Sequence, residues 1–191
     1  VNVGLPEIDE KEMMVRVMSE LQSVSDIPLQ IDTSSPDVME AALRRYNGKA
    51  LVNSVNGKRE AMDAVFPLVK KYGGVVVALT LDESGIPETS AGRMKIVNKI
   101  LKRAEYYGIS KKNILIDALT MSVSSDTNAA LATLETVKQV TAMGVGTVLG
   151  VSNISFGLPN REFVTGAFFT LAMENGLTSA IINPLALEIK K

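Results

Sequence analysis

The sequence predicts an α/β fold in which parallel strands alternate with helices and close into a (β/α)8 TIM barrel. Short apolar runs alternate with amphipathic stretches along the chain, and no linker rich in Pro, Gly or Ser interrupts them. Strict strand–helix alternation implies a parallel sheet, either doubly wound or closed as a barrel. We expect a single domain over residues 1–191, although a complete barrel has roughly 250 residues.

Seven apolar runs are predicted as strands, with one helix between each run and the next. They are Val1–Gly4, Leu29–Asp32, Ala50–Asn53, Val75–Thr80, Ile114–Asp117, Val145–Asn153 and Ser179–Asn183. Val75–Thr80 is almost entirely apolar, as expected for a strand that is covered on both faces. Val1–Gly4 reads as a strand that is already ending. We therefore expect the barrel to lack its N-terminal first strand in this chain.

The segments between these runs repeat their apolar residues with a helical period. Ser35 and Pro36 supply an N-cap and a proline for the first turn of one helix, and Asn47-Gly48 ends it. The other predicted helices are Lys11–Leu21, Arg59–Tyr72, Ala91–Tyr107, Thr127–Met143 and Arg161–Glu174.

The composition excludes several classes of function. The chain has no cysteine and no histidine, which removes disulfides, thiolate nucleophiles, Ser-His-Asp catalysis and Cys- or His-ligated metals. A formal charge of −1 provides no field that would attract nucleic acid or an anionic membrane. No apolar run approaches the roughly 20 residues that span a bilayer, and no signal peptide is visible. We expect a cytoplasmic protein without a metal site.

Most of the predicted strands end in a single Asp, Asn or Thr. These residues are Asn2, Asp32, Asn53, Thr80, Asp117, Asn153 and Asn183. In a parallel barrel all strand C-termini face one rim, which holds the active site. Any one of them could instead cap a helix, but most lie several residues before the next helix. Two carboxylates and several amides without a cation suit a neutral heterocycle with N–H donors better than a phosphate.

At these strand ends the sequence resembles the pterin-binding barrel of methyltetrahydrofolate:corrinoid methyltransferases, which include the folate domain of cobalamin-dependent methionine synthase. The resemblance runs from Val1 to about Pro184 and rests on VNVGLPEID, IDTSSPDVMEAAL, ALVNSVNG, ALTLDESGIP, ILIDALTM, TVLGVSNISFGLPNR and AIINP. It implies a barrel of the dihydropteroate synthase-like type. It also implies that the chain binds 5-methyltetrahydrofolate and transfers the N5 methyl group to Co(I) of a corrinoid.

The resemblance also implies roles for individual residues. Asp32, Asn53 and Asp117 match residues that hydrogen-bond the pterin ring, and Asn153 matches the asparagine near N5, the catalytic position. Asn2, Gly150, Ser152 and Ser155 are expected to line the same rim. Arg161 is expected either to reach the folate tail or to be a surface charge.

The expected chemistry needs a partner and a proton. Without histidine the chain cannot ligate cobalamin through imidazole, so a corrinoid-binding protein or domain is expected to bring it; the barrel could also form a homodimer. The Asn153 amide can donate and accept but cannot supply the N5 proton, which we expect from solvent through a water network linked to an Asp. Three alternatives stay open: a dihydropteroate synthase-like enzyme, although the stretch 152–156 lacks a basic residue, a non-catalytic folate-binding module, and an unrelated βα-barrel enzyme.

Overall fold

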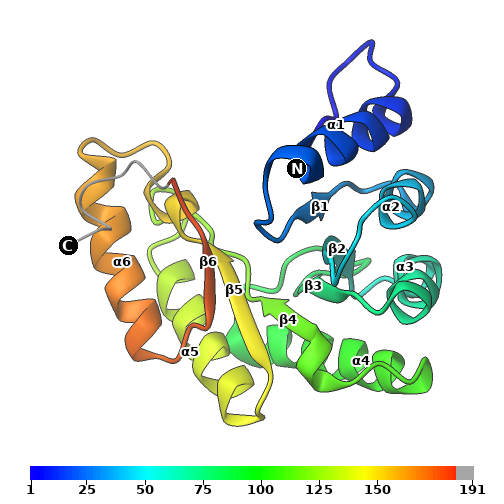
Figure 1. Ribbon diagram of the computed structural model, residues 1–191. Helices are drawn as coiled ribbons and strands as arrows, with labels where there is room; N and C mark the ends of the chain where they lie inside the picture. The colour runs from blue at the N-terminus through cyan, green and yellow to red at the C-terminus, as the bar shows by residue number, and fades with distance from the viewer. Residues whose placement is uncertain (184–191) are drawn as a thin grey trace.

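The computed structural model describes residues 1–183, whose six strands form one curled, all-parallel sheet (Figure 1). The strands follow one another in sequence order: β1 (Gln30–Asp32), β2 (Leu51–Asn56), β3 (Val75–Leu79), β4 (Ile114–Asp117), β5 (Gly146–Gly150) and β6 (Ser179–Ile181). Within these residues β1 and β6 remain unpaired with each other. The fold is therefore the predicted (β/α) barrel type, present as an open half-barrel.

The helices lie on the outer side of this sheet (Figure 1). They are α1 (Glu10–Val24), α2 (Pro36–Leu43), α3 (Arg59–Tyr72), α4 (Ser90–Tyr106), α5 (Ala129–Ala142) and α6 (Arg161–Glu174), with short 3-10 turns η1 (Lys111–Asn113) and η2 (Val151–Ser155). Local signals explain their ends. Ser35 Oγ accepts from the Val38 amide at the start of α2, and Gly73, with φ 72°, ends α3.

Two aliphatic clusters join the helices to the sheet. The larger cluster packs alternate strand residues, such as Val52, Val76 and Ile116, against α1 to α4. The smaller one packs Leu149 of β5 against α5 and α6, which contribute Val137 and Phe168 among others. The helices thus cover one face of the sheet and leave the other face to form the barrel interior.

Val1–Gly4 is not a strand, contrary to the prediction. Val1 alone pairs with β1: its N–H donates to the Gln30 carbonyl, and its carbonyl accepts from the Asp32 amide at 2.9 Å, as in a parallel ladder. The chain then turns away, because Asn2 Oδ1 accepts from the Gly4 amide at 3.1 Å.

Other predicted strand ends also need correction. Instead of running to Asn153, β5 ends at Gly150 and the chain continues as the 3-10 turn η2. In contrast, β2 runs three residues beyond Asn53, and its register with β3 shifts at a bulge between Asn53 and Val55. Thr80 and Asn183 lie just past β3 and β6. Among the described residues, no helix is long and apolar enough to cross a membrane.

Candidate functional site

Asp32 and Asn53 stand side by side on the inner face of the sheet. Strand side chains alternate between faces, and Val52 of β2 points outward into the core. Its neighbour Asn53 therefore faces inward, and Asp32 of β1 is the register partner of Asn53. Adjacent strands lie about 4.8 Å apart. A carboxylate and an amide thus start from neighbouring positions in the barrel interior.

Asp117 lies on the same face of the sheet, two residues nearer the rim than Asn53. Asn53 is in register with Val77 of β3, and Val77 is in register with Leu115 of β4. Asp117 follows Leu115 by two residues, and such residues share a face of a strand. The structure therefore brings Asp32, Asn53 and Asp117 to one side of the sheet, at its C-terminal end.

Asn56 is a rim residue that sequence reasoning missed. A residue three positions after Asn53 should point to the opposite face. The bulge between Asn53 and Val55 shifts the register, so Asn56 aligns with Leu79, which in turn pairs with Asp117. Asn56 therefore faces inward at the level of Asp117. The bulge is a feature of the pairing between β2 and β3, and no sequence pattern indicated it.

The amide of Asn153 covers the rim end of β5. Gly150 ends this strand two residues after Val148, the register partner of Asp117, so a side chain at Gly150 would point inward. A Cβ placed there would lie 3.2 Å from Asn153 Nδ2. The amide group of Asn153 thus fills the space that the glycine leaves, on the strand next to Asp117.

The environment of Asp117 favours its protonated form. Burial raises the pKa of Asp117 to about 6, although its carboxylate accepts from the Leu119 amide at 2.8 Å and feels the charge of Arg93. Both of those contacts favour the ionised form, so desolvation dominates. A carboxyl group that titrates near neutral pH can exchange a proton with a ligand or with water.

Three of the predicted site residues have polar side chains without a hydrogen-bond partner among the described residues. Within residues 1–183, the side chains of Asp32, Asn53 and Asn153 form no hydrogen bond, although each is only partly exposed. Polar groups in such positions usually have partners, so these three are available to a ligand. Asn2 differs, because it is exposed and its Oδ1 is engaged by the Gly4 amide.

Ser155 and Arg161 fasten the loop that carries Asn153. Ser155 is fully buried, and its hydroxyl lies 3.1 Å from the Ser152 carbonyl and 3.0 Å from Thr165 Oγ1. Arg161, at the start of α6, donates to Ser155 Oγ at 3.1 Å and to the Ser152 carbonyl at 3.0 Å. The Ser155 hydroxyl and the Arg161 guanidinium are therefore occupied in holding η2 in place, and Ser152 contributes its carbonyl to that arrangement.

Hydrogen bonds also join the loop after β4 to η2. Ser122 and Ser124 both donate to the Phe156 carbonyl, at 2.6 and 2.8 Å. The Val123 amide donates to the Ile154 carbonyl at 3.1 Å. The loops that follow Asp117 and Asn153 are thereby held against each other.

Arg93 is a second residue that sequence reasoning missed. It is 1% exposed and donates to the Ala118 carbonyl at 2.7 Å, directly behind the loop that follows Asp117. A signal was present, because Arg93 precedes Ile96, Val97 and Ile100 by three, four and seven residues and so lies on the apolar face of α4.

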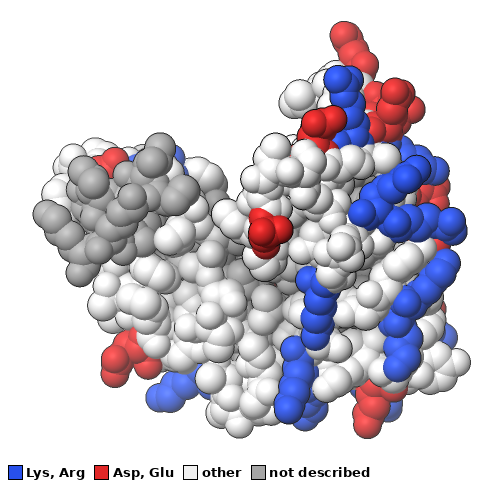
Figure 2. Space-filling view, viewed as in Figure 1, with Lys and Arg blue, Asp and Glu red and all other residues white. Residues whose placement is uncertain are grey.

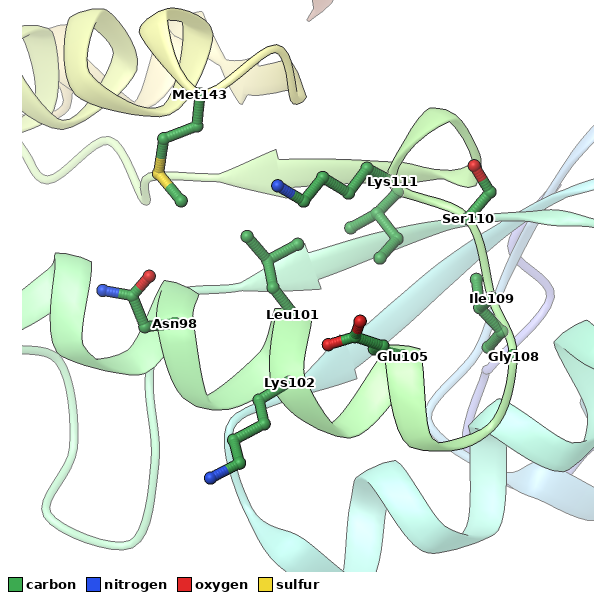
Figure 3. A pocket seen from close by; sticks show the side chains of 10 residues that line it. Asn98, Leu101, Lys102, Glu105, Gly108, Ile109, Ser110, Lys111 and Met143 are labelled. Carbon is green, nitrogen blue, oxygen red and sulfur yellow. The ribbon is translucent and has the colours of Figure 1, made fainter.

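The surface is hollowed beside the α1 side of the molecule, and the described residues that face this hollow are mostly uncharged (Figure 2). A separate cavity of about 590 Å³ lies at the other end of β4, where Leu101 of α4 and Met143 approach each other (Figure 3). Ile114, the first residue of β4, lines it. This cavity is thus remote from the strand ends that carry the site.

Two rim positions from the sequence analysis offer less to a ligand. Thr80 is fully buried, and its hydroxyl has no partner among the described residues. Asn183 is exposed beyond the end of β6. Across residues 1–183, no group of three or more Asp and Glu side chains is arranged to hold a metal ion.

The chain belongs to the pterin-binding enzyme family, whose sequence pattern matches residues 2–183. Methylcorrinoid:tetrahydrofolate methyltransferase from Eubacterium limosum is 32% identical over 184 residues, covering 94% of this chain and 67% of that protein. Methionine synthase from Mycobacterium tuberculosis is 30% identical over 184 residues, covering 89% of this chain but only 15% of that protein. The predicted resemblance to the methyltetrahydrofolate:corrinoid methyltransferase group is thereby confirmed.

Solved structures agree on the fold. Dihydropteroate synthase from Clostridium difficile, solved in the presence of pteroic acid, has a TM-score of 0.77 at 20% identity and is 76% covered by the whole chain. Dihydropteroate synthase from Thermus thermophilus has a TM-score of 0.76 at 20% identity, covering 96% of this chain and 77% of the other. At this level of identity the likeness establishes the shared barrel fold alone.

Proposed function

We propose that this chain binds 5-methyltetrahydrofolate at the C-terminal rim and transfers its N5 methyl group to Co(I) of a corrinoid carried by a partner protein or domain. The observation that carries the proposal is the placement of Asp117, at the end of β4, next to Asn153, whose amide lies over the end of the adjacent strand β5, on the same inner face as Asp32 and Asn53. The methyltransferase relatives support the reaction type.

The pterin ring supplies N–H donors that match carboxylate and amide acceptors on this face. Asp32 and Asp117 accept from the pterin, and Asn53 orients it. Methyl transfer breaks the bond between N5 and the methyl carbon, forms a bond from that carbon to cobalt, and leaves an electron pair on N5 that takes a proton. The Asn153 amide stabilises N5 before and after protonation. Asp117 links the site to solvent protons, because its pKa near 6 lets it change charge under working conditions.

The test separates binding from chemistry. Asn153→Ala should slow single-turnover methyl transfer to free cob(I)alamin by about 100-fold, because an electrostatic partner of the transition state is lost, while the Kd for 5-methyltetrahydrofolate changes little. Asp117→Ala should weaken binding by about 2–5 kcal/mol through loss of a charge-assisted partner.

Asn98→Ala is the matched control, since Asn98 lines the cavity at the other end of β4; it should leave both quantities unchanged. Weakened binding with an intact bound-state rate in Asn153→Ala would contradict the role of Asn153. Wild-type affinity in Asp117→Ala would contradict the pocket itself. Transfer should be followed in both directions, because the Eubacterium limosum relative is named for transfer from methylcorrinoid to tetrahydrofolate.

Dihydropteroate synthesis is the second candidate, favoured by the solved structures that share the fold. Residues 152–156 read Ser-Asn-Ile-Ser-Phe and offer no basic side chain for a diphosphate. Incubation with a pterin diphosphate and 4-aminobenzoate should therefore give no pteroate. Turnover in that assay would replace the methyl-transfer proposal.

A further inference from the structure

Arg93 is a buried arginine that has no carboxylate among its hydrogen-bond partners in residues 1–183. Its Nε donates to the Pro87 carbonyl at 2.9 Å. Its Nη1 lies 2.7 Å from the Ala118 carbonyl, 3.2 Å from the Leu119 carbonyl and 2.8 Å from Thr133 Oγ1. Removing a guanidinium from water is costly, and these hydrogen bonds to three carbonyls and one hydroxyl offset that cost.

Two of the groups that Arg93 contacts, the carbonyls of Ala118 and Leu119, belong to the turn directly after Asp117. Leu119 in this turn has a φ of 60°, a conformation that bulky residues rarely adopt. In that conformation the Leu119 amide donates to the Asp117 carboxylate at 2.8 Å, while its carbonyl faces Arg93 and Thr133. The peptide unit between Ala118 and Leu119 therefore contacts Arg93 through its carbonyl and the Asp117 carboxylate through its N–H.

Charge connects the two residues as well. Burial lowers the pKa of Arg93, whereas the carboxylates of Asp117 and Asp126 raise it. In return the guanidinium charge of Arg93 favours the ionised form of Asp117, against the burial that favours the neutral form. Asp117 and Asp126 are the acidic groups whose charges act on Arg93, and Arg93 is the cationic group whose charge acts on Asp117.

We propose that Arg93 is a positioning residue for Asp117: it holds the turn 118–120 in the conformation that presents the Asp117 carboxylate to the barrel interior, and it supplies the nearby positive charge. The proposal rests on the proposed function only in naming the pterin as the ligand that Asp117 meets. It assigns a role in ligand binding to a residue of α4 that lies behind the site.

The experiment compares the full chain with Arg93→Met, Arg93→Lys and Thr133→Val. Arg103→Met is the matched control, because Arg103 is on the same helix but pairs with Asp63 on the outer surface. One readout is the titration midpoint of the Asp117 carboxyl, followed by NMR of the protein labelled with ¹³C in aspartate. The other is the Kd for 5-methyltetrahydrofolate at pH 7, with each Kd corrected for the folded fraction from urea unfolding.

Arg93→Met should raise the Asp117 midpoint by about one pH unit and weaken binding at least 10-fold. Arg93→Lys should keep most of the midpoint but still weaken binding, since it retains the charge and loses the planar fork. Thr133→Val should shift both in the same direction by less, and Arg103→Met should shift neither.

A folded Arg93 variant with wild-type midpoint and affinity would overturn the proposal, even if its stability had fallen, because a structural role alone predicts that result. If the wild-type chain failed to bind 5-methyltetrahydrofolate, the proposed function would fall. A raised Asp117 midpoint in Arg93→Met would then still support the positioning of Asp117 by Arg93. The two failures are thus distinguishable.

Discussion

Gly150 matters to the candidate site because it has no side chain. The Asn153 amide occupies the space where a side chain at Gly150 would stand, so two residues that are three apart in sequence form one local unit. The backbone of Gly150, at φ −77° and ψ 81°, does not itself require glycine, since its φ is negative. The demand for glycine at this position therefore comes from the neighbouring amide.

Gly150→Ala should consequently displace the Asn153 amide by a few tenths of an ångström without unfolding the chain. We expect methyl transfer to slow by about 10-fold, because small misplacements of reacting groups are costly, and stability to change by less than about 1 kcal/mol. Single-turnover rates would measure this. In an Asn153→Ala background the same change should have no further effect, and an equal loss in both backgrounds would show that Gly150 acts by another route.

At the scale of elements, the loop that follows Asp117 and the turn η2 that carries Asn153 depend on each other. Ser122 and Ser124 reach from the loop after β4 to the Phe156 carbonyl just beyond η2. Arg161 of α6 also holds η2 in place, because its guanidinium donates a hydrogen bond to the Ser152 carbonyl. The rim is thus built by hydrogen bonds between loops in addition to the strands beneath them.

The double variant Ser122→Ala/Ser124→Ala should loosen that connection. Each lost hydrogen bond is worth about 0.5–1.5 kcal/mol, and a similar total should appear as faster amide hydrogen exchange in residues 151–158. Affinity for 5-methyltetrahydrofolate should fall several-fold. Ser19→Ala removes a comparable bond within α1 and is the control. Unchanged exchange in residues 151–158 would mean that the Val123 amide alone holds the loops together.

The sequence predicts an element well where a periodic pattern of apolar residues determines it. All six helices and the strands β1 to β6 show in the sequence, because burial of one helical stripe or one strand face imposes a period on the apolar residues. The sequence does not predict the ends of β2 and β5, because the bulge after Asn53 belongs to the pairing of β2 with β3, and the chain leaves β5 at Gly150 as the 3-10 turn η2 without a change in its apolar pattern. Such pairing leaves no local pattern.

The candidate site divides in the same way. Asp32, Asn53 and Asp117 could be predicted because each ends or interrupts an apolar run. Asn56 and Arg93 could not be selected from polarity alone: one needs the bulge, and the other sits in a helix that contains several other charged residues. The expected homodimer has no support in the single chain or its relatives and stays a prediction.

At the scale of the whole molecule, the fold buries the carboxyl group of Asp117 in an environment that disfavours its ionised form. The pKa of Asp117 is raised to about 6 in the folded chain, from an ordinary value of 3.8. The other described carboxyl groups with shifted pKa values are those of Glu40, Asp63 and Glu83. Hydrogen bonds and nearby cations lower the pKa of each of them. Asp117 therefore opposes folding at neutral pH, as functional groups often do.

The sign of the pH dependence follows from this shift. Between about pH 4 and pH 6 the folded chain holds the Asp117 proton and the unfolded chain does not, so the free energy of unfolding should fall as pH rises through that window. This rise in the pKa of Asp117 lowers the free energy of unfolding at neutral pH by at most about 3 kcal/mol. The carboxyls with lowered pKa values act in the opposite direction, because their contribution to the free energy of unfolding grows as pH rises towards their ordinary values of 3.8 and 4.5.

Urea unfolding at pH 4, 5, 6 and 7 should show this decline in the wild-type chain. Asp117→Asn keeps an acceptor for the Leu119 amide and removes the charge, so it should be more stable than wild type at pH 7 and nearly flat between pH 4 and pH 6. The same variant should bind 5-methyltetrahydrofolate more weakly, because the carboxylate that destabilises the fold is the group that we propose to accept hydrogen bonds from the pterin. An equal slope in both proteins would place the destabilising charge elsewhere.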